Sequence, residues 1–66
     1  MKPVNWENPN IKRIRQELNM TKEAFAQLLG VSRRKVHRWE LEEYKPTKLE
    51  RLGIKVIYDE MTRKDG

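Results

Sequence analysis

Apolar side chains recur at helical spacing in the first thirty residues. Ile11, Ile14 and Leu18 stand at i, i+3 and i+7, which places them on one face of a helix. A second helix is predicted after Thr21, a suitable N-cap residue, and it ends before Gly30, which can adopt the positive φ that closes a helix. The residues expected on its buried face are Phe25, Ala26, Leu28 and Leu29.

A third, short helix is predicted from Arg33 to Glu40. Ser32 precedes it as an N-cap and follows the second helix so closely that the chain must turn sharply between them. Its apolar residues, Val36 and Trp39, are three apart and form one narrow buried stripe. The rest of its circumference faces water and is strongly basic.

The last third of the chain predicts one longer helix. Pro46 ends a polar segment, because the residue before a proline is pushed out of the helical region, and Thr47 can cap the helix that follows. Gly53 lies in its middle, and we attribute this glycine to close approach of another helix. The residues expected to face the core are Leu49, Leu52, Val56, Ile57 and Met61.

These segments predict an all-α fold, a compact four-helix bundle, and a simple division of the chain. Residues 1–9 contain prolines and asparagines without a helical period and form an irregular N-terminal arm, in which Trp6 is expected to cover the edge of the core. Residues 10–62 form the domain, and residues 63–66 are expected to fray.

Composition narrows the class of protein. The 66 residues suffice for one domain with a small core. Because the chain has no cysteine, neither a disulfide nor a thiolate zinc site can supplement that core. Fifteen Lys and Arg against ten Asp and Glu give a net charge of +5, which favours a polyanionic partner. No apolar run is long enough for a membrane span or a signal peptide, so we expect a soluble, cytoplasmic protein.

Catalytic chemistry is not expected. The single histidine, His37, has no cysteine, no Ser/Asp partner of catalytic appearance and no glycine-rich phosphate loop near it in the sequence. The same lack of cysteine and of a second histidine argues against a tight transition-metal site. We therefore expect no enzyme activity, no metal and no cofactor.

Two short helices joined by a tight turn, the second one basic on its exposed side, describe a helix-turn-helix. The segment from Lys22 to Trp39, KEAFAQLLGVSRRKVHRW, resembles the helix-turn-helix of the lambda-repressor-like, Cro-type family of transcriptional regulators. A looser resemblance extends over residues 10–61. It implies a bundle of four or five helices, commonly dimeric, that binds operator DNA with its recognition helix in the major groove.

The resemblance also implies which residues face DNA. The candidate base contacts are Arg33, Arg34, Arg38 and His37. A guanidinium can donate two bonds to guanine, worth about 1–3 kcal/mol of discrimination, so we favour Arg33 and Arg34, then Arg38. A phosphate contact is the alternative for each arginine, and His37 is more readily explained as solvent-facing. The candidate phosphate contacts are Lys22, Lys35, Thr21, Ser32 and Lys45, although capping alone is favoured for Thr21 and Ser32.

The sequence departs from the family directly after the recognition helix. Leu41, Glu42 and Glu43 stand where many members have a glycine and basic residues. Carboxylates there would repel phosphate, which weakens the case for Lys45. With Glu40, they are expected to confine the positive face to the first two turns of the helix.

The preferred function is therefore sequence-specific binding of double-stranded DNA by a small regulator, most simply a repressor. A homodimer would place two recognition helices about 34–36 Å apart, one turn of DNA. The alternative is an antitoxin-type module that binds a toxin partner and represses its own promoter. Apolar groups for which the small core has little room bear on both ideas: Trp6, Tyr44, Ile54 and Tyr58. A slightly larger core within the monomer is the alternative to a dimer as the place for Tyr44, Ile54 and Tyr58.

Overall fold

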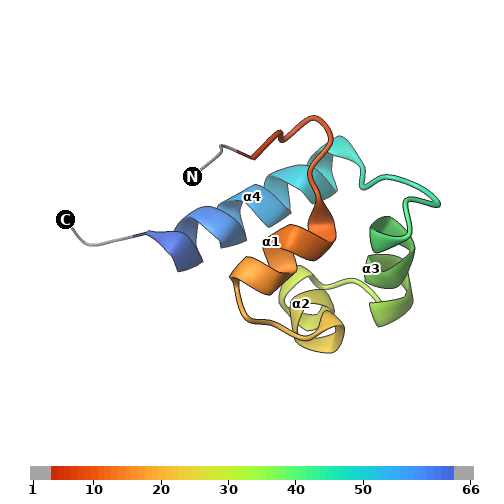
Figure 1. The fold of residues 1–66 in the computed structure, drawn as a ribbon, viewed down its shortest axis with the longest axis horizontal. Helices are drawn as coiled ribbons and strands as arrows, with labels where there is room; N and C mark the ends of the chain where they lie inside the picture. Colours follow the sequence, from red (N-terminus) through yellow and green to blue (C-terminus); the bar gives the residue numbers. More distant parts are fainter. Residues whose placement is uncertain (1–3, 64–66) are drawn as a thin grey trace.

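The computed structural model describes residues 4–63, which form four helices and no strand (Figure 1). Three short helices are followed by a longer one that runs along the bundle. Their bounds are α1 Ile11–Glu17, α2 Lys22–Leu29, α3 Arg33–Glu40 and α4 Lys48–Thr62. The predicted all-α, four-helix architecture is confirmed, and α3 has the bounds expected from the sequence.

Each helix begins at a side chain that caps it. The cap oxygen accepts a hydrogen bond from the backbone amide three residues later, which satisfies one of the free amides of the first turn. In α4 the arrangement is reciprocal, because Glu50 also accepts from the backbone amide of Thr47 at 2.8 Å. The four caps are Asn10, Thr21, Ser32 and Thr47.

The first three helices end in the same backbone motif. Asn19, Gly30 and Glu42 follow α1, α2 and α3 with φ values of 55°, 74° and 60°, in the left-handed region. In each case the amide of the next residue donates to the carbonyl five positions before it, as in a Schellman ending. Glycine adopts this conformation freely and asparagine tolerates it, whereas a glutamate such as Glu42 does so with strain.

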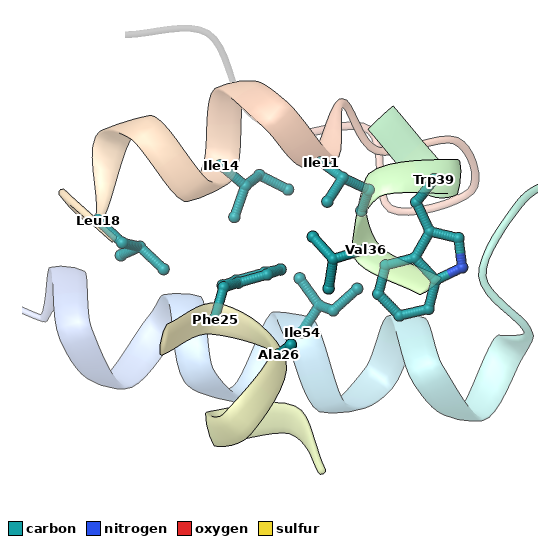
Figure 2. Close-up of a cluster of buried hydrophobic side chains, with 8 residues drawn as sticks. All are labelled: Ile11, Ile14, Leu18, Phe25, Ala26, Val36, Trp39 and Ile54. Carbon is teal, nitrogen blue, oxygen red and sulfur yellow. The ribbon is translucent and has the colours of Figure 1, made fainter. Parts of the chain in front are cut away.

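One apolar cluster joins all four helices (Figure 2). Phe25, Val36 and Ile54 are completely buried and come from α2, α3 and α4. The predicted α1 face is buried as expected, as are both apolar residues of α3. The full set of buried apolar residues is Ile11, Ile14, Leu18, Phe25, Ala26, Val36, Trp39 and Ile54.

The predicted buried stripe of α4 was wrong for four of its five residues, since only Ile57 packs against the core. Leu49, Leu52 and Val56 are 78%, 57% and 55% exposed, whereas Ile54, which the sequence analysis placed outside the core, is 0% exposed. Met61, also expected inside, is half exposed. The helix is apolar on two opposite sides, and packing against Phe25 and Val36 selects the side that carries Ile54.

Two smaller expectations about α2 and α4 also need correction. Leu28 is 50% exposed rather than buried, because α2 presents Phe25 and Ala26 to the core. Leu29 does lie against Gly53, but a Cβ at this glycine would stand 3.8 Å from the nearest Leu29 carbon, an ordinary contact. Helix approach alone therefore does not require glycine at position 53.

The described part of the N-terminal arm covers the core edge between α1 and α4, as predicted for Trp6. The Trp6 ring meets the Tyr58 ring edge-on, with centroids 5.8 Å apart. The Tyr58 hydroxyl donates a 2.5 Å hydrogen bond to Glu17 of α1. This bond lowers the pKa of Glu17 and raises the pKa of Tyr58. Tyr58 therefore belongs to the fold rather than to a free surface.

A largely buried ion pair connects α1 to the end of α3. Arg15 donates from two of its nitrogens to the two carboxylate oxygens of Glu40, at 2.7 and 3.2 Å. A third Arg15 nitrogen donates to the backbone carbonyl of Met20. The Glu40 side chain is only 5% exposed, so this pair is shielded from water. The pair therefore ties the C-terminal end of α3 to α1.

We predict that Arg15→Met will destabilise the protein by about 3–5 kcal/mol, because it leaves the Glu40 carboxylate buried without a partner. Replacing both residues, Arg15→Met with Glu40→Leu, should restore most of the loss. Urea titrations followed by circular dichroism measure both changes. A double variant no more stable than the single one would contradict this account of the pair.

We predict that Glu42→Gly will stabilise the protein by about 1 kcal/mol, because glycine adopts the left-handed backbone without a side-chain penalty. Asn19→Gly is the matched control at the end of α1, and its gain should be smaller because asparagine already tolerates this conformation. Thermal and urea unfolding measure both. Equal effects of the two substitutions would show that Glu42 is not strained.

Candidate nucleic-acid interface

Helices α2 and α3 form a rigid unit around the turn at Gly30. Phe25 and Ala26 of α2 pack in the same cluster as Val36 and Trp39 of α3 (Figure 2). The Val31 amide bonds back to the Ala26 carbonyl at 3.0 Å and closes the end of α2. Because two sides of α3 face other helices, only one side of it remains open to a partner.

The open side of α3 is cationic. Arg33, Arg34 and His37 are exposed and Arg38 is half-buried, so the structure brings all four predicted base-contacting residues to one helix. At 3.6 residues per turn, Arg34, His37 and Arg38 lie directly opposite the buried stripe, with Arg33 at the edge. Within residues 4–63, no carboxylate lies within salt-bridge distance of these three arginines.

Ion pairs occupy the other charged groups of α3. Lys35 pairs with Glu50 of α4, and this hydrogen bond raises the pKa of Lys35. Burial alone would raise the pKa of Glu50, but hydrogen bonds from Lys35 and Thr47 outweigh it and hold that pKa below its usual value. Lys35 therefore lies on the α4 side of the recognition helix, away from the arginines.

The expectation that Glu40 helps to confine the positive face of α3 was wrong. Its carboxylate is buried against Arg15 and does not limit the positive face. Glu42 and Glu43 are exposed as expected, and Lys45 is exposed in the loop that follows. The positive face is therefore bounded at its C-terminal end by two carboxylates, instead of three, that have no ion pair within residues 4–63.

His37 is connected to the start of α2. The Nζ atom of Lys22 lies 2.9 Å from Nδ1 of His37. Because an ammonium group only donates, this contact requires the tautomer in which Nδ1 accepts and Nε2 carries the proton. The contact places the cation at the N-terminus of α2 beside the arginines of α3, and it brings together two candidates that the sequence analysis treated separately.

The two hydroxyl candidates serve as caps. Thr21 Oγ1 accepts from the Ala24 amide and Ser32 Oγ accepts from the Lys35 amide, both at 3.1 Å. This confirms the capping role favoured from the sequence. Both residues are nevertheless exposed, and each hydroxyl retains a proton that it can donate.

Trp39 fills the end of the core nearest the loop before α4. Its indole nitrogen points away from the apolar cluster in Figure 2 and is buried, with no hydrogen-bond acceptor among the described residues. A phosphate does not reach this nitrogen, because it is closed off from solvent. Trp39 positions α3 by packing.

Sequence reasoning missed the ion pairs that frame the arginines. The position of Glu50 at the start of α4 could have been predicted, since it stands three residues after Thr47 in the pattern of a capping box. Arg15 and Glu40 are 25 residues apart and carry no local signal of their pairing. In the part of the chain that the structure describes, no cluster of three metal-ligating side chains occurs and no helix is long and apolar enough to cross a membrane.

Two turn-linked helices, with free arginines along the open side of the second, define a helix-turn-helix domain, a class that binds duplex DNA. The comparison with family models agrees, because the helix-turn-helix model matches residues 11–54, two thirds of the chain. The chain belongs to this lambda-repressor-like, Cro-type family of DNA-binding transcriptional regulators. No curated protein and no solved structure gives a significant match.

We predict that the protein will lose stability as the pH falls below the ordinary glutamate pKa of 4.5, since folding lowers the pKa of Glu50. A lowered folded-state pKa adds stability above the unfolded value, and protonation removes it. Glu50→Gln should remove about 1 kcal/mol or less near neutral pH and make the acid dependence shallower. Urea unfolding at several pH values measures this.

Glu43→Gln is the control for this experiment, because it removes an exposed carboxylate that has no ion pair among residues 4–63. An acid dependence equally steep in wild type and Glu50→Gln would contradict the role given to the Lys35–Glu50 pair.

Proposed function

We propose that this protein is a cytoplasmic, sequence-specific transcriptional repressor that inserts α3 into the major groove of its operator. The observation that carries the proposal is the open side of α3, where Arg33, Arg34 and Arg38 have no carboxylate partner in the described chain. Nearby carboxylates Glu40 and Glu50 are already paired with other cations. The free positive charge is thus concentrated where a DNA groove can approach.

We assign base reading to Arg33 and Arg34 first, and then to Arg38. Arg33 and Arg34 lie in the first turn of α3, the part of a recognition helix that contacts base edges in this class. Their guanidinium groups suit the O6 and N7 acceptors of guanine. His37, with its proton on Nε2, can donate one bond to a base or a phosphate at the same surface.

Phosphate binding is assigned to the start of α2 and to the ends of the motif. Lys22 lies there with the free amides of the first turn, whose partial positive charge favours an anion. Lys22 is held beside α3 by His37, so one phosphate bound there would set the register of the helix in the groove. Thr21, Ser32 and Lys45 are secondary candidates, and Lys35 must first leave Glu50.

We further propose that the repressor acts as a homodimer, since a two-fold pair of recognition helices reads two half-sites one turn apart. The antitoxin alternative depended partly on apolar groups outside the core. Of these, Ile54 is completely buried, and Trp6 and Tyr58 pack against the core. Tyr44 remains 40% exposed. No feature of the described residues favours a toxin over a second copy of this chain.

We predict different effects for base-reading and phosphate-binding residues. Arg34→Ala should reduce the preference for the cognate site over random DNA by about 10-fold or more, corresponding to the loss of a bidentate base contact. Lys22→Ala should weaken binding to both DNAs about equally and lower the salt dependence of binding by about one charge. Fluorescence anisotropy with labelled duplexes at several salt concentrations measures both.

The control is Lys12→Ala, an exposed lysine on α1, which should change neither quantity appreciably. If Arg34→Ala and Lys22→Ala lower binding to specific and random DNA by the same factor, Arg34 is a phosphate contact and the base-reading assignment fails.

A further inference from the structure

Lys35 differs from the arginines of the recognition helix, because it already has a carboxylate partner. Its ammonium group pairs with Glu50 at the start of α4. Within residues 4–63, the three arginines of the same helix have no such partner. At 3.6 residues per turn, Arg33 lies at one edge of the open side of α3 and Lys35 at the opposite edge. Of these two edge residues, only Arg33 has no ion pair in the described chain.

Cations at the edges of a recognition helix are placed for a different contact from those at its centre. A helix in the major groove has a sugar–phosphate backbone on each side, and the base edges form the floor of the groove. Side chains at the helix edges therefore meet phosphates, which set the register but carry no sequence information. A lysine suits this contact, because its ammonium group is a compact point charge. Lys35 has the position and chemistry of a phosphate contact, but its charge is offset in the free protein.

The carboxylate of Glu50 is held in place by the backbone, independently of Lys35. Its Oε1 atom accepts a hydrogen bond from the Thr47 amide at 2.8 Å, and the Glu50 amide donates to Thr47 Oγ1 at 3.2 Å. The other carboxylate oxygen, Oε2, faces Lys35. One carboxylate thus caps α4 and binds α3 at the same time. Lys35 can leave it without undoing the start of α4, because the two contacts use different oxygens.

The pair of Lys35 and Glu50 is shielded enough to compete with DNA for the lysine. The Glu50 side chain is 18% exposed and the Lys35 side chain 36%, so water and salt screen their attraction less than in a fully exposed pair. A phosphate that binds Lys35 leaves the Glu50 carboxylate without its cation and close to another anion. The counterion release that normally drives a phosphate contact is then largely cancelled. The contact becomes fully favourable only when the carboxylate loses its charge.

We propose that Glu50 limits the affinity of the protein for DNA by holding Lys35 of the recognition helix, and that Lys35 binds a phosphate when this ion pair opens. The inference rests on the DNA binding proposed above and adds a residue that sets its strength. Because every duplex carries phosphates, Glu50 lowers the affinity for cognate and random DNA alike. Glu50 therefore sets the affinity, whereas the arginines set the sequence preference.

Glu50→Gln tests the proposal, because glutamine keeps the capping-box hydrogen bond to the Thr47 amide but carries no charge. The substitution should tighten binding to cognate and random duplexes about threefold to fivefold. It should also steepen the salt dependence of binding by about one charge, since Lys35 then contacts a phosphate without losing an ion pair. Fluorescence anisotropy at several salt concentrations measures both, and circular dichroism confirms that the variant is folded.

A double-mutant cycle separates Lys35 from a general effect of charge. Lys35→Ala should change the affinity of the wild type by less than about twofold, but in the Glu50→Gln background it should remove the whole gain. Asp59→Asn is the matched control. It changes the net charge by the same amount and also releases a lysine, Lys55, but that lysine lies on α4 rather than on the recognition helix. It should leave the affinity nearly unchanged.

The outcomes separate this inference from the proposed function. A gain in affinity that persists after Lys35→Ala, or an equal gain in Asp59→Asn, is a general charge effect and overturns the role of Glu50. The absence of any gain in Glu50→Gln also overturns it, while a wild type that still prefers its cognate duplex leaves the proposed function intact. A wild-type protein that binds no duplex preferentially defeats the proposed function and this inference with it.

Discussion

Helices of eight residues are too short to be stable alone. The position of α3 therefore depends on its contacts with the other helices. Val36 and Trp39 supply its apolar contacts, and the buried pair of Arg15 and Glu40 fixes its far end against α1. The pair is costly to desolvate, and it is satisfied only because Arg15 makes three hydrogen bonds in this geometry. The direction in which α3 presents its arginines follows from that arrangement.

The same packing determines which charged side chains near α3 form ion pairs and which do not. Carboxylates near α3 are occupied by cations that face other helices: Glu40 by Arg15 and Glu50 by Lys35. Among residues 4–63, the three arginines that remain have no ion-pair partner, so part of the chain's positive charge is concentrated on one open side of α3. A polyanion approaching that side meets free guanidinium groups without having to break an existing ion pair.

The local features of the fold could be predicted from sequence because they depend on neighbouring residues. The caps at Thr21 and Ser32, the turn at Gly30 and the bounds of α3 all follow from backbone chemistry within a few positions. The face of α4 could not be predicted this way, since Ile54 and Leu52 lie on two apolar sides of one helix. Only the shape of the space left by Phe25 and Val36 decides between them. For the candidate interface, the helix and its arginines were predictable, whereas the burial of Glu40 depended on a residue 25 positions away.

The error on α4 also changes which residues the molecule exposes. Leu49, Leu52 and Val56, which were expected in the core, lie on the outer face of the helix. The central claim, that the arginine side of α3 reads a DNA sequence, is tested most directly by selecting bound sequences from a random duplex pool. We predict an enriched motif that contains guanines in two inverted half-sites whose centres are about 34–36 Å apart. A pool that shows no enriched sequence after selection with the folded protein would contradict that claim.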